Sequence, residues 1–164
     1  MQVDLEKIVR EGGALEAVVP SGTLDGDADR AIEAGPGALK GRLTRMRNGF
    51  DLRASYSGWL TLECVRCLEP FRMDLGFDFR LLFVSAEAHA APGSELKIQE
   101  EDCDLYTCRG GKIDLAAISR EQVYLQIPLK PVCEDSCRGL CAVCGENLNR
   151  GPCRCGEAAR VPVI

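Results

Sequence analysis

The chain has 164 residues, 46% of them hydrophobic, and it carries ten cysteines and a formal net charge of −5. This length suffices for one domain with its own core and a small appended module. The acidic balance argues against a general nucleic-acid coat, and no stretch approaches the roughly 20 consecutive apolar residues that a membrane-spanning helix needs.

The first ten residues mix acids and bases without an apolar run, so we expect no secretory leader. Disulfide frameworks, the rival explanation for many cysteines, belong to oxidising compartments. We therefore expect a cytoplasmic protein whose reduced thiols are available to a metal ion.

The first elements in chain order are weakly signalled. Residues 15–19 are typical of a strand, and residues 25–34 are typical of a short helix. Residues 39–47 are expected to form a further strand, which carries four basic side chains: Lys40, Arg42, Arg45 and Arg47. Their spacing puts them on both faces of that strand, and we favour a solvated edge strand over a phosphate-binding patch.

Strict alternation of apolar and polar residues over 50–63 predicts a half-buried strand of an antiparallel sheet. Asn48-Gly49 predicts a hairpin turn that joins it to the preceding strand. The alternation resumes over 71–83. We therefore expect a three-stranded meander whose second hairpin has residues 64–70 as its tip.

Residues 85–101 show neither period and predict a loop, which contains the single histidine, His89, as a solvated bystander. Asp114 is a typical N-cap for a helix that continues to Leu125 and stops before Pro128. The apolar side of this helix should lie on the sheet.

Together these patterns predict an α+β fold: an antiparallel β-sheet meander with one main helix over residues 1–130, followed by a zinc-stabilised C-terminal segment over residues 131–164. After Pro131 the chain contains almost no large apolar residue until Val161. This stretch cannot bury enough surface to fold by itself, so we expect a metal to hold it against the sheet domain.

Eight cysteines have spacings typical of metal ligands: Cys64, Cys67, Cys133, Cys137, Cys141, Cys144, Cys153 and Cys155. Cys-x-x-Cys turns bring two soft ligands together, so eight thiols predict two tetrahedral Zn²⁺ ions of structural type. We expect the last four cysteines to bind one ion and the first four to bind the other, which would join the tail to the hairpin tip. Other groupings, such as Cys64 and Cys67 with Cys141 and Cys144, stay open at this point.

No site with an open coordination position, phosphate loop or nucleophile with a histidine partner is apparent, so the sequence predicts no enzyme and no small-molecule substrate. Glu63 and Glu69 flank the first cysteine pair and are expected to be solvated. Cys103 and Cys108 lack a knuckle glycine and are expected to be ordinary cysteines, with a third metal site or a redox pair as alternatives.

Three segments, in order, resemble a known family: Cys64-Val-Arg-Cys67-Leu-Glu-Pro-Phe71, Gly111-Lys-Ile-Asp-Leu115 leading into residues 120–128, and Cys133-Glu-Asp-Ser-Cys137-Arg-Gly-Leu-Cys141-Ala-Val-Cys144-Gly145. They resemble the YceD family of large ribosomal RNA subunit accumulation proteins, over roughly residues 39–156. The resemblance implies a non-enzymatic factor in ribosome biogenesis. The resemblance also supports the grouping above, because some family members keep the first cysteine pair and metal-capable residues near the positions of Cys133 and Cys137 but lack the later cysteines.

Our leading hypothesis is therefore a zinc-binding factor that supports accumulation or processing of large-subunit ribosomal RNA. Direct RNA contact would use arginines near the cysteines: Arg66, Arg72, Arg138, Arg150 and Arg154. The alternative is an adaptor that binds a ribosomal protein or a nuclease without touching RNA. A thiol redox or metal sensor is the third hypothesis.

Overall fold

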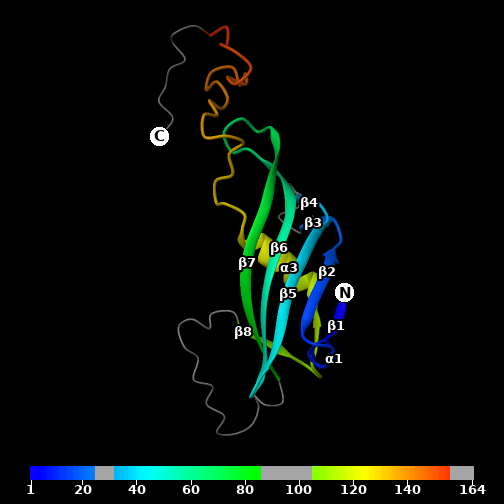
Figure 1. Ribbon diagram of the computed structural model, residues 1–164. Helices are drawn as coiled ribbons and strands as arrows, with labels where there is room; N and C mark the ends of the chain where they lie inside the picture. The colour runs from blue at the N-terminus through cyan, green and yellow to red at the C-terminus, as the bar shows by residue number, and fades with distance from the viewer. Residues whose placement is uncertain (25–31, 86–104, 156–164) are drawn as a thin grey trace, which may run out of the picture.

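The computed structural model describes residues 1–24, 32–85 and 105–155 (Figure 1). Its elements in chain order are β1 (Gln2–Asp4), α1 (Leu5–Arg10), β2 (Ala14–Val19), β3 (Gly22–Leu24), β4 (Ile32–Ala34), β5 (Gly37–Met46), β6 (Gly49–Glu63), β7 (Pro70–Ser85), β8 (Leu105–Cys108), β9 (Lys112–Asp114) and α3 (Leu115–Leu125). The α+β class predicted from the sequence is confirmed.

Strands β5, β6 and β7 form the predicted antiparallel meander. The first hairpin pairs Met46 with Gly49, so its turn is Arg47-Asn48 and not the predicted Asn48-Gly49. Gly49 instead begins β6, where a Cβ atom would lie 1.8 Å from the carbonyl oxygen of Phe83 on β7. Close approach of two backbones, not turn geometry, is therefore what requires glycine here.

Two predictions for the first half of the chain are wrong. The predicted helix over 25–34 is contradicted at its end, where Ile32–Ala34 form strand β4 between β3 and β6; residues 25–31 lie outside the described residues. Strand β5 is no edge strand, because β2 pairs with it from Val19 opposite Gly37 to Ala14 opposite Arg42. The predicted strand over 15–19 thus supplies the neighbour that covers β5.

The sheet is mixed and not purely antiparallel, because β8 pairs with the end of β7 in parallel. Ser85, predicted to begin a loop, is the last residue of β7. The rest of the predicted loop, with His89, lies outside the described residues. A second, two-stranded sheet joins β1 to β9 at the N-terminus of α3.

Helix α3 lies across the inner face of the sheet (Figure 1). The Asp114 carboxylate caps it by accepting from the backbone N–H groups of Ala116 and Ala117 at 3.0 and 3.2 Å, as predicted. Its apolar side contributes Leu115 and Val123 to the core. The strands β5, β6 and β7 contribute inward side chains that include Leu39, Leu52, Leu60, Leu81 and Phe83. Among the described residues, no helix is long and apolar enough to cross a membrane.

Strands β6 and β7 run on together past α3, and the chain after α3 returns to their shared tip (Figure 1). The backbone N–H of Val65 at this tip donates to the carbonyl oxygen of Pro131 at 2.9 Å. The cysteine-rich segment therefore begins in contact with the hairpin tip. The division into units of 1–130 and 131–164 stays a prediction.

Candidate metal centres

The hairpin tip that joins β6 to β7 is a tight knuckle around two buried cysteines, Cys64 and Cys67. The backbone N–H of Cys64 donates to Glu69 at 3.0 Å, and that of Leu68 donates back to Cys64 at 2.9 Å. Leu68 has a φ of 58°, a left-handed conformation that knuckles usually assign to glycine. The turn thereby directs both thiols to the same side.

Cys133 and Cys137 arrive from the segment after α3 and complete the first group of four sulfurs. The sulfurs of Cys64 and Cys137 lie 3.8 Å apart, and those of Cys67 and Cys133 also lie 3.8 Å apart. Three of these cysteines are buried, and Phe71, Val132 and Leu140 pack around the group.

The second group consists of Cys141, Cys144, Cys153 and Cys155. Its first pair forms a knuckle like the one at the hairpin tip: the backbone N–H of Gly145 donates to Cys141 at 2.9 Å, with Gly145 at a φ of 73°. The sulfurs of Cys141 and Cys153 are 3.5 Å apart. The structure thus brings together the two groups of four that the spacing predicted.

The sulfur spacing fits a tetrahedral metal ion. Two thiolates at a Zn–S distance of about 2.3 Å from a tetrahedral centre are about 3.8 Å apart, whereas disulfide sulfurs are about 2.0 Å apart. Within each group all four sulfurs lie within 4.8 Å of one another. Each group could therefore hold one metal ion, and four soft sulfur ligands suit zinc better than calcium or magnesium.

Backbone N–H groups favour the thiolate form of the first cysteine in each knuckle. Burial raises the pKa of Cys64, but the amides of three neighbouring residues outweigh it and lower the pKa to about 6. The amides of Cys144 and Val143 lower the pKa of Cys141 to about 7. Hydrogen bonds to a thiolate stabilise its negative charge, which a metal ligand must carry.

Other thiols of the two groups hold their protons more strongly. Burial, with its neighbouring thiols, raises the pKa of Cys133 to about 12. The hydrogen bond with Cys144, followed by burial, raises the pKa of Cys155 to about 12. A metal ion that binds all four sulfurs must displace such protons, so its affinity falls as the pH falls.

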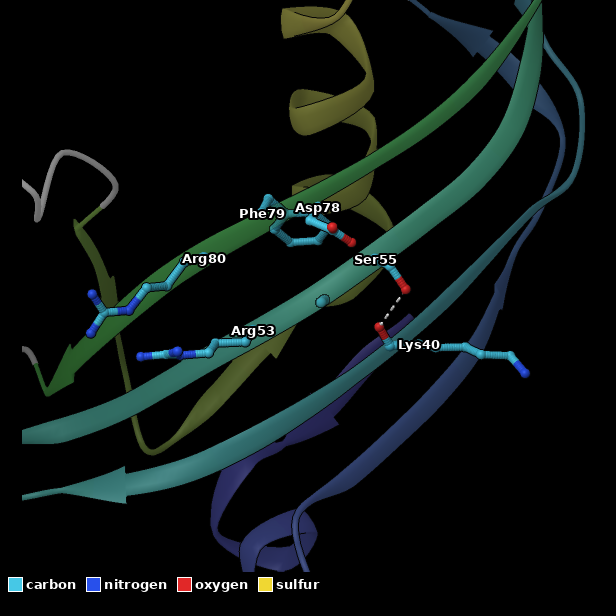
Figure 2. Close-up of a pocket in the computed structure, with 7 residues that line it drawn as sticks. Lys40, Arg53, Ser55, Asp78, Phe79 and Arg80 are labelled. Carbon is cyan, nitrogen blue, oxygen red and sulfur yellow. Dashed lines mark hydrogen bonds between the residues drawn. The ribbon is translucent and has the colours of Figure 1, made fainter.

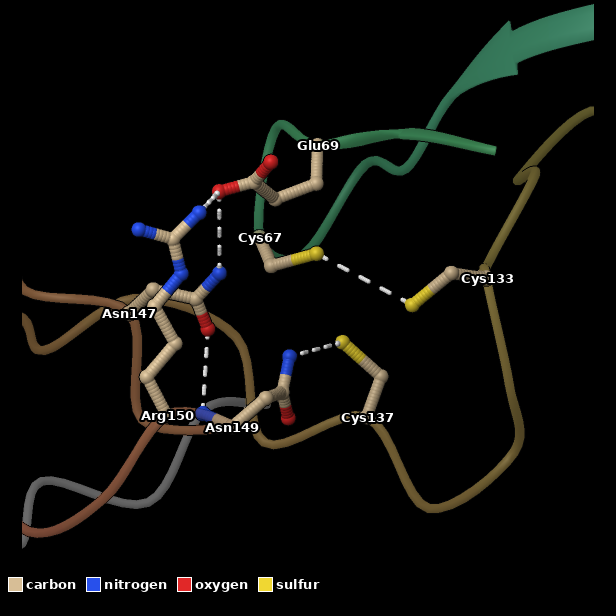
Figure 3. A network of polar contacts seen from close by, with 7 residues as sticks. All are labelled: Cys67, Glu69, Cys133, Cys137, Asn147, Asn149 and Arg150. Atoms are coloured by element: carbon tan, nitrogen blue, oxygen red, sulfur yellow. Dashed lines mark hydrogen bonds and ion pairs between the residues drawn. The ribbon is translucent and has the colours of Figure 1, made fainter.

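Side chains from the loop of the second group form hydrogen bonds with residues of the first group and of the hairpin tip (Figure 3). The Asn149 amide, from the loop of the second group, donates to the sulfur of Cys137 in the first group at 3.2 Å. The same amide's oxygen accepts from the backbone N–H of Arg138 at 2.7 Å. Asn149 therefore orients a ligand of one centre from the loop of the other, a role that spacing alone does not indicate.

Glu69 is a second contact that the sequence analysis missed. It was predicted to be solvated, but its carboxylate accepts from Arg150 at 2.6 Å and from Asn147 at 3.4 Å (Figure 3). Glu69 belongs to the hairpin tip, and both partners belong to the loop of the second group. The ion pair thus adds to the contacts that hold the tail on the tip.

The five predicted RNA-binding arginines do not share one role. Arg66 donates to the carbonyl oxygens of Asp135 and Cys137 at 3.0 and 3.1 Å, and Arg150 binds Glu69. Arg72 binds Asp74 at 2.9 Å and lies over the ring of Trp59. Only Arg138 and Arg154 have no side-chain partner among the described residues. RNA contact by these five arginines stays a prediction.

Cys108 is 2% exposed and belongs to the core, where its thiol donates to the carbonyl oxygen of Val84 at 3.4 Å. Cys103 lies outside the described residues. Among the residues that the structure describes, the two groups of four are the clusters that could hold a metal ion.

The structure is thus a mixed β-sheet with two groups of four cysteines at one end, each of which could hold a metal ion. The chain belongs to the YceD family: residues 52–162 match the family described as large ribosomal RNA subunit accumulation protein YceD. No solved structure matches the chain.

The chain is also similar to named relatives. It is 27% identical over 174 residues to the chloroplastic "Large ribosomal RNA subunit accumulation protein YCED homolog 1" of Zea mays, covering 93% of the chain and 59% of the relative. It is 32% identical over 109 residues to the protein of the same name from Arabidopsis thaliana, covering 66% of the chain and 33% of the relative. An uncharacterised protein of Mycobacterium leprae is 30% identical over 149 residues, covering 88% of the chain and 66% of the relative.

The left-handed residue after each knuckle generates the first prediction. Leu68 is 52% exposed, so replacing its side chain should lose little burial free energy. Leu68→Gly should remove the cost of the left-handed conformation, about 1–2 kcal/mol, and the added chain entropy of the unfolded state should offset about 0.4–1 kcal/mol of this gain. The net result should be a more stable protein. Gly145→Ala should cost about 1–2 kcal/mol, because no atom lies within 4 Å of the added Cβ and only φ is strained. Urea unfolding of the metal-loaded protein measures both changes.

The matched control is Val143→Gly, which places a glycine in the second knuckle at a residue without positive φ. It should destabilise the protein. A Leu68→Gly variant that loses as much stability as this control would contradict the account of the hairpin knuckle.

Asn149 generates the second prediction. Asn149→Ala removes the N–H group that donates a hydrogen bond to the sulfur of Cys137. Loss of a hydrogen bond to a metal ligand typically weakens metal binding about 10–100-fold. One of two bound ions should therefore pass to a competing chelator at a lower chelator concentration than in the unmodified protein. The exposed hairpin residue Asn48, changed to Ala, serves as the control; equal retention of both ions in the Asn149 variant would refute the role.

Proposed function

We propose that this chain is a non-enzymatic factor in ribosome biogenesis that holds two structural Zn²⁺ ions and supports accumulation or processing of large-subunit ribosomal RNA. The observation that carries the proposal is the pair of all-cysteine groups with tetrahedral sulfur spacing in a chain of the YceD family. The maize and Arabidopsis relatives, which are named large ribosomal RNA subunit accumulation proteins, support the role in RNA accumulation.

The chemistry of the donor sets supports a structural ion over a catalytic one. Each group supplies four thiols, which fill a tetrahedral shell and leave no position for a substrate or an activated water. When bound, the metal supplies a cross-link between chain segments that are far apart in sequence. Contacts of Glu69, Arg150 and Asn149 set the position of the tail on the hairpin tip.

The chain spans about three fifths of the maize relative and one third of the Arabidopsis relative. The partner we propose is ribosomal RNA or a ribosome-assembly protein. The cytoplasmic location expected from the sequence stays a prediction.

An adaptor for a ribosomal protein or a nuclease is the second candidate, and an apolar groove favours it. The groove, of about 360 Å³, lies between the hairpin tip and the segment after α3, and its lining includes Val65, Pro70, Ile127 and Leu129. Leu129 is fully exposed at its rim. The acidic balance of the chain would suit a basic ribosomal protein.

The third prediction tests the proposed function in cells. Depletion of the protein should lower the ratio of large-subunit to small-subunit ribosomal RNA, and the unmodified gene should restore it. Cys133→Ser with Cys137→Ser should fail to restore it, because two ligands of the first group are lost. Ser136→Ala, an exposed residue between these cysteines, is the matched control and should restore the ratio fully.

An unchanged ratio on depletion would contradict the proposal. To separate the two candidates, the tagged protein is recovered from cell extract with and without nuclease treatment. Partners that are lost after nuclease support RNA contact, and protein partners that persist support the adaptor.

A further inference from the structure

Three arginines form a row across the solvent face of the central sheet. In the strand register Arg42 on β5 is directly opposite Arg53 on β6, and Arg53 is directly opposite Arg80 on β7. All three are exposed. Neighbouring strands are about 4.8 Å apart, so the row spans about 10 Å.

Like charges directly opposite one another destabilise a sheet, so the fold itself does not account for this row. The carboxylate of Asp51, which is 8% exposed, accepts from Arg80 at 3.1 Å and lies 3.6 Å from Arg53. Arg42, by contrast, makes no ion pair with any residue that the structure describes. Asp51 therefore fixes two guanidinium groups side by side, and the third projects from the next strand.

A shallow hollow of about 640 Å³ adjoins the row on the same face (Figure 2). Figure 2 shows Arg53 and Arg80 extending together in one direction, with Lys40 extending in the opposite direction beyond Ser55. One acid, Asp78, also lines the hollow. The Lys40 ammonium lies 3.9 Å from Glu16, and both side chains are more than two thirds exposed, so this pair is weak.

The solvent face of β5, β6 and β7 beside the hollow carries few bulky side chains. Beside the arginine row on this face is the row of Lys40, Ser55 and Asp78, and the row after that is Ala38, Ser57 and Gly76. Trp59 lies farther along this face, but its ring is covered by Arg72, 4.7 Å from its centroid, and by Gly35, where a Cβ would meet the ring at 2.0 Å. Among the described residues, this face therefore offers cations and open backbone, without a free aromatic ring on which a base could stack.

Guanidinium groups bind phosphate oxygens through paired N–H donors, and a row about 10 Å long can contact more than one phosphate. We infer that the face carrying Lys40, Arg42, Arg53 and Arg80 binds the phosphate backbone of RNA, with no readout of base sequence. This inference rests on the proposed function and names a surface distinct from the arginines around the cysteines. It also places basic groups locally on a chain whose net charge is negative.

The test measures binding of the whole 164-residue chain to a short fluorescein-labelled RNA of mixed sequence by anisotropy, over a range of salt concentrations. The double variant Lys40→Gln, Arg42→Gln removes two cations without leaving Asp51 unpaired, and thermal unfolding checks that it stays folded. The slope of log affinity against log salt should fall by about 0.7–0.9 for each cation that contacts a phosphate. Arg42→Lys keeps the charge and should keep most of the slope.

Arg120→Gln, an exposed cation on α3 at the opposite face, is the matched control and should leave the slope unchanged. An unchanged slope in the double variant overturns the inference, as does competition by polyglutamate as effective as that by unlabelled RNA. The proposed function fails separately, if depletion leaves the large-subunit RNA ratio unchanged. Both the inference and the proposed function would be supported if the double variant loses RNA binding and also fails to restore the large-subunit RNA ratio in depleted cells.

Discussion

The convergence of Cys64 and Cys67 with Cys133 and Cys137 is the constraint on which the far end of the molecule depends. From Pro131 onward the described chain has no helix or long strand, and its burial is centred on cysteines rather than on large apolar side chains. Such a segment gains too little from hydrophobic burial to offset its conformational entropy. Metal binding would supply the missing free energy, and folding of the tail and occupancy of the centres would then be one equilibrium.

The two groups of cysteines are also connected to each other by side-chain contacts. Asn149 reaches from the loop of the second group to a ligand of the first, and Glu69 reaches from the hairpin tip to that same loop. An ion in one group would therefore order side chains that contact the other. The sheet, in contrast, has a core of its own between α3 and the meander, separate from the buried group around the first four cysteines.

Much of this arrangement could be predicted from the sequence because it depends on local patterns. The two-residue period fixed the meander, Asp114 located the start of α3, and the cysteine spacing indicated both groups of four. What could not be predicted depends on long-range pairing. The short strand β4, the parallel partner β8 and the interior place of β5 are decided by neighbours that no local period reveals.

The same limit applies to the site. Glu69 has no spacing signal, and its role emerges only when the loop of the second group is folded against the tip. Leu68 stands where a glycine would have signalled the left-handed turn. The arginine row is invisible in the sequence, since Arg42, Arg53 and Arg80 become neighbours only through the register of three strands.

The central claim is that the tail is joined to the hairpin tip by a metal ion. The most direct test is elemental analysis of the protein and of a Cys64→Ser, Cys67→Ser variant, with limited proteolysis of both. The account predicts two zinc ions per chain, falling to one in the variant, with cleavage appearing between residues 126 and 138. An unchanged zinc count in the variant would contradict it.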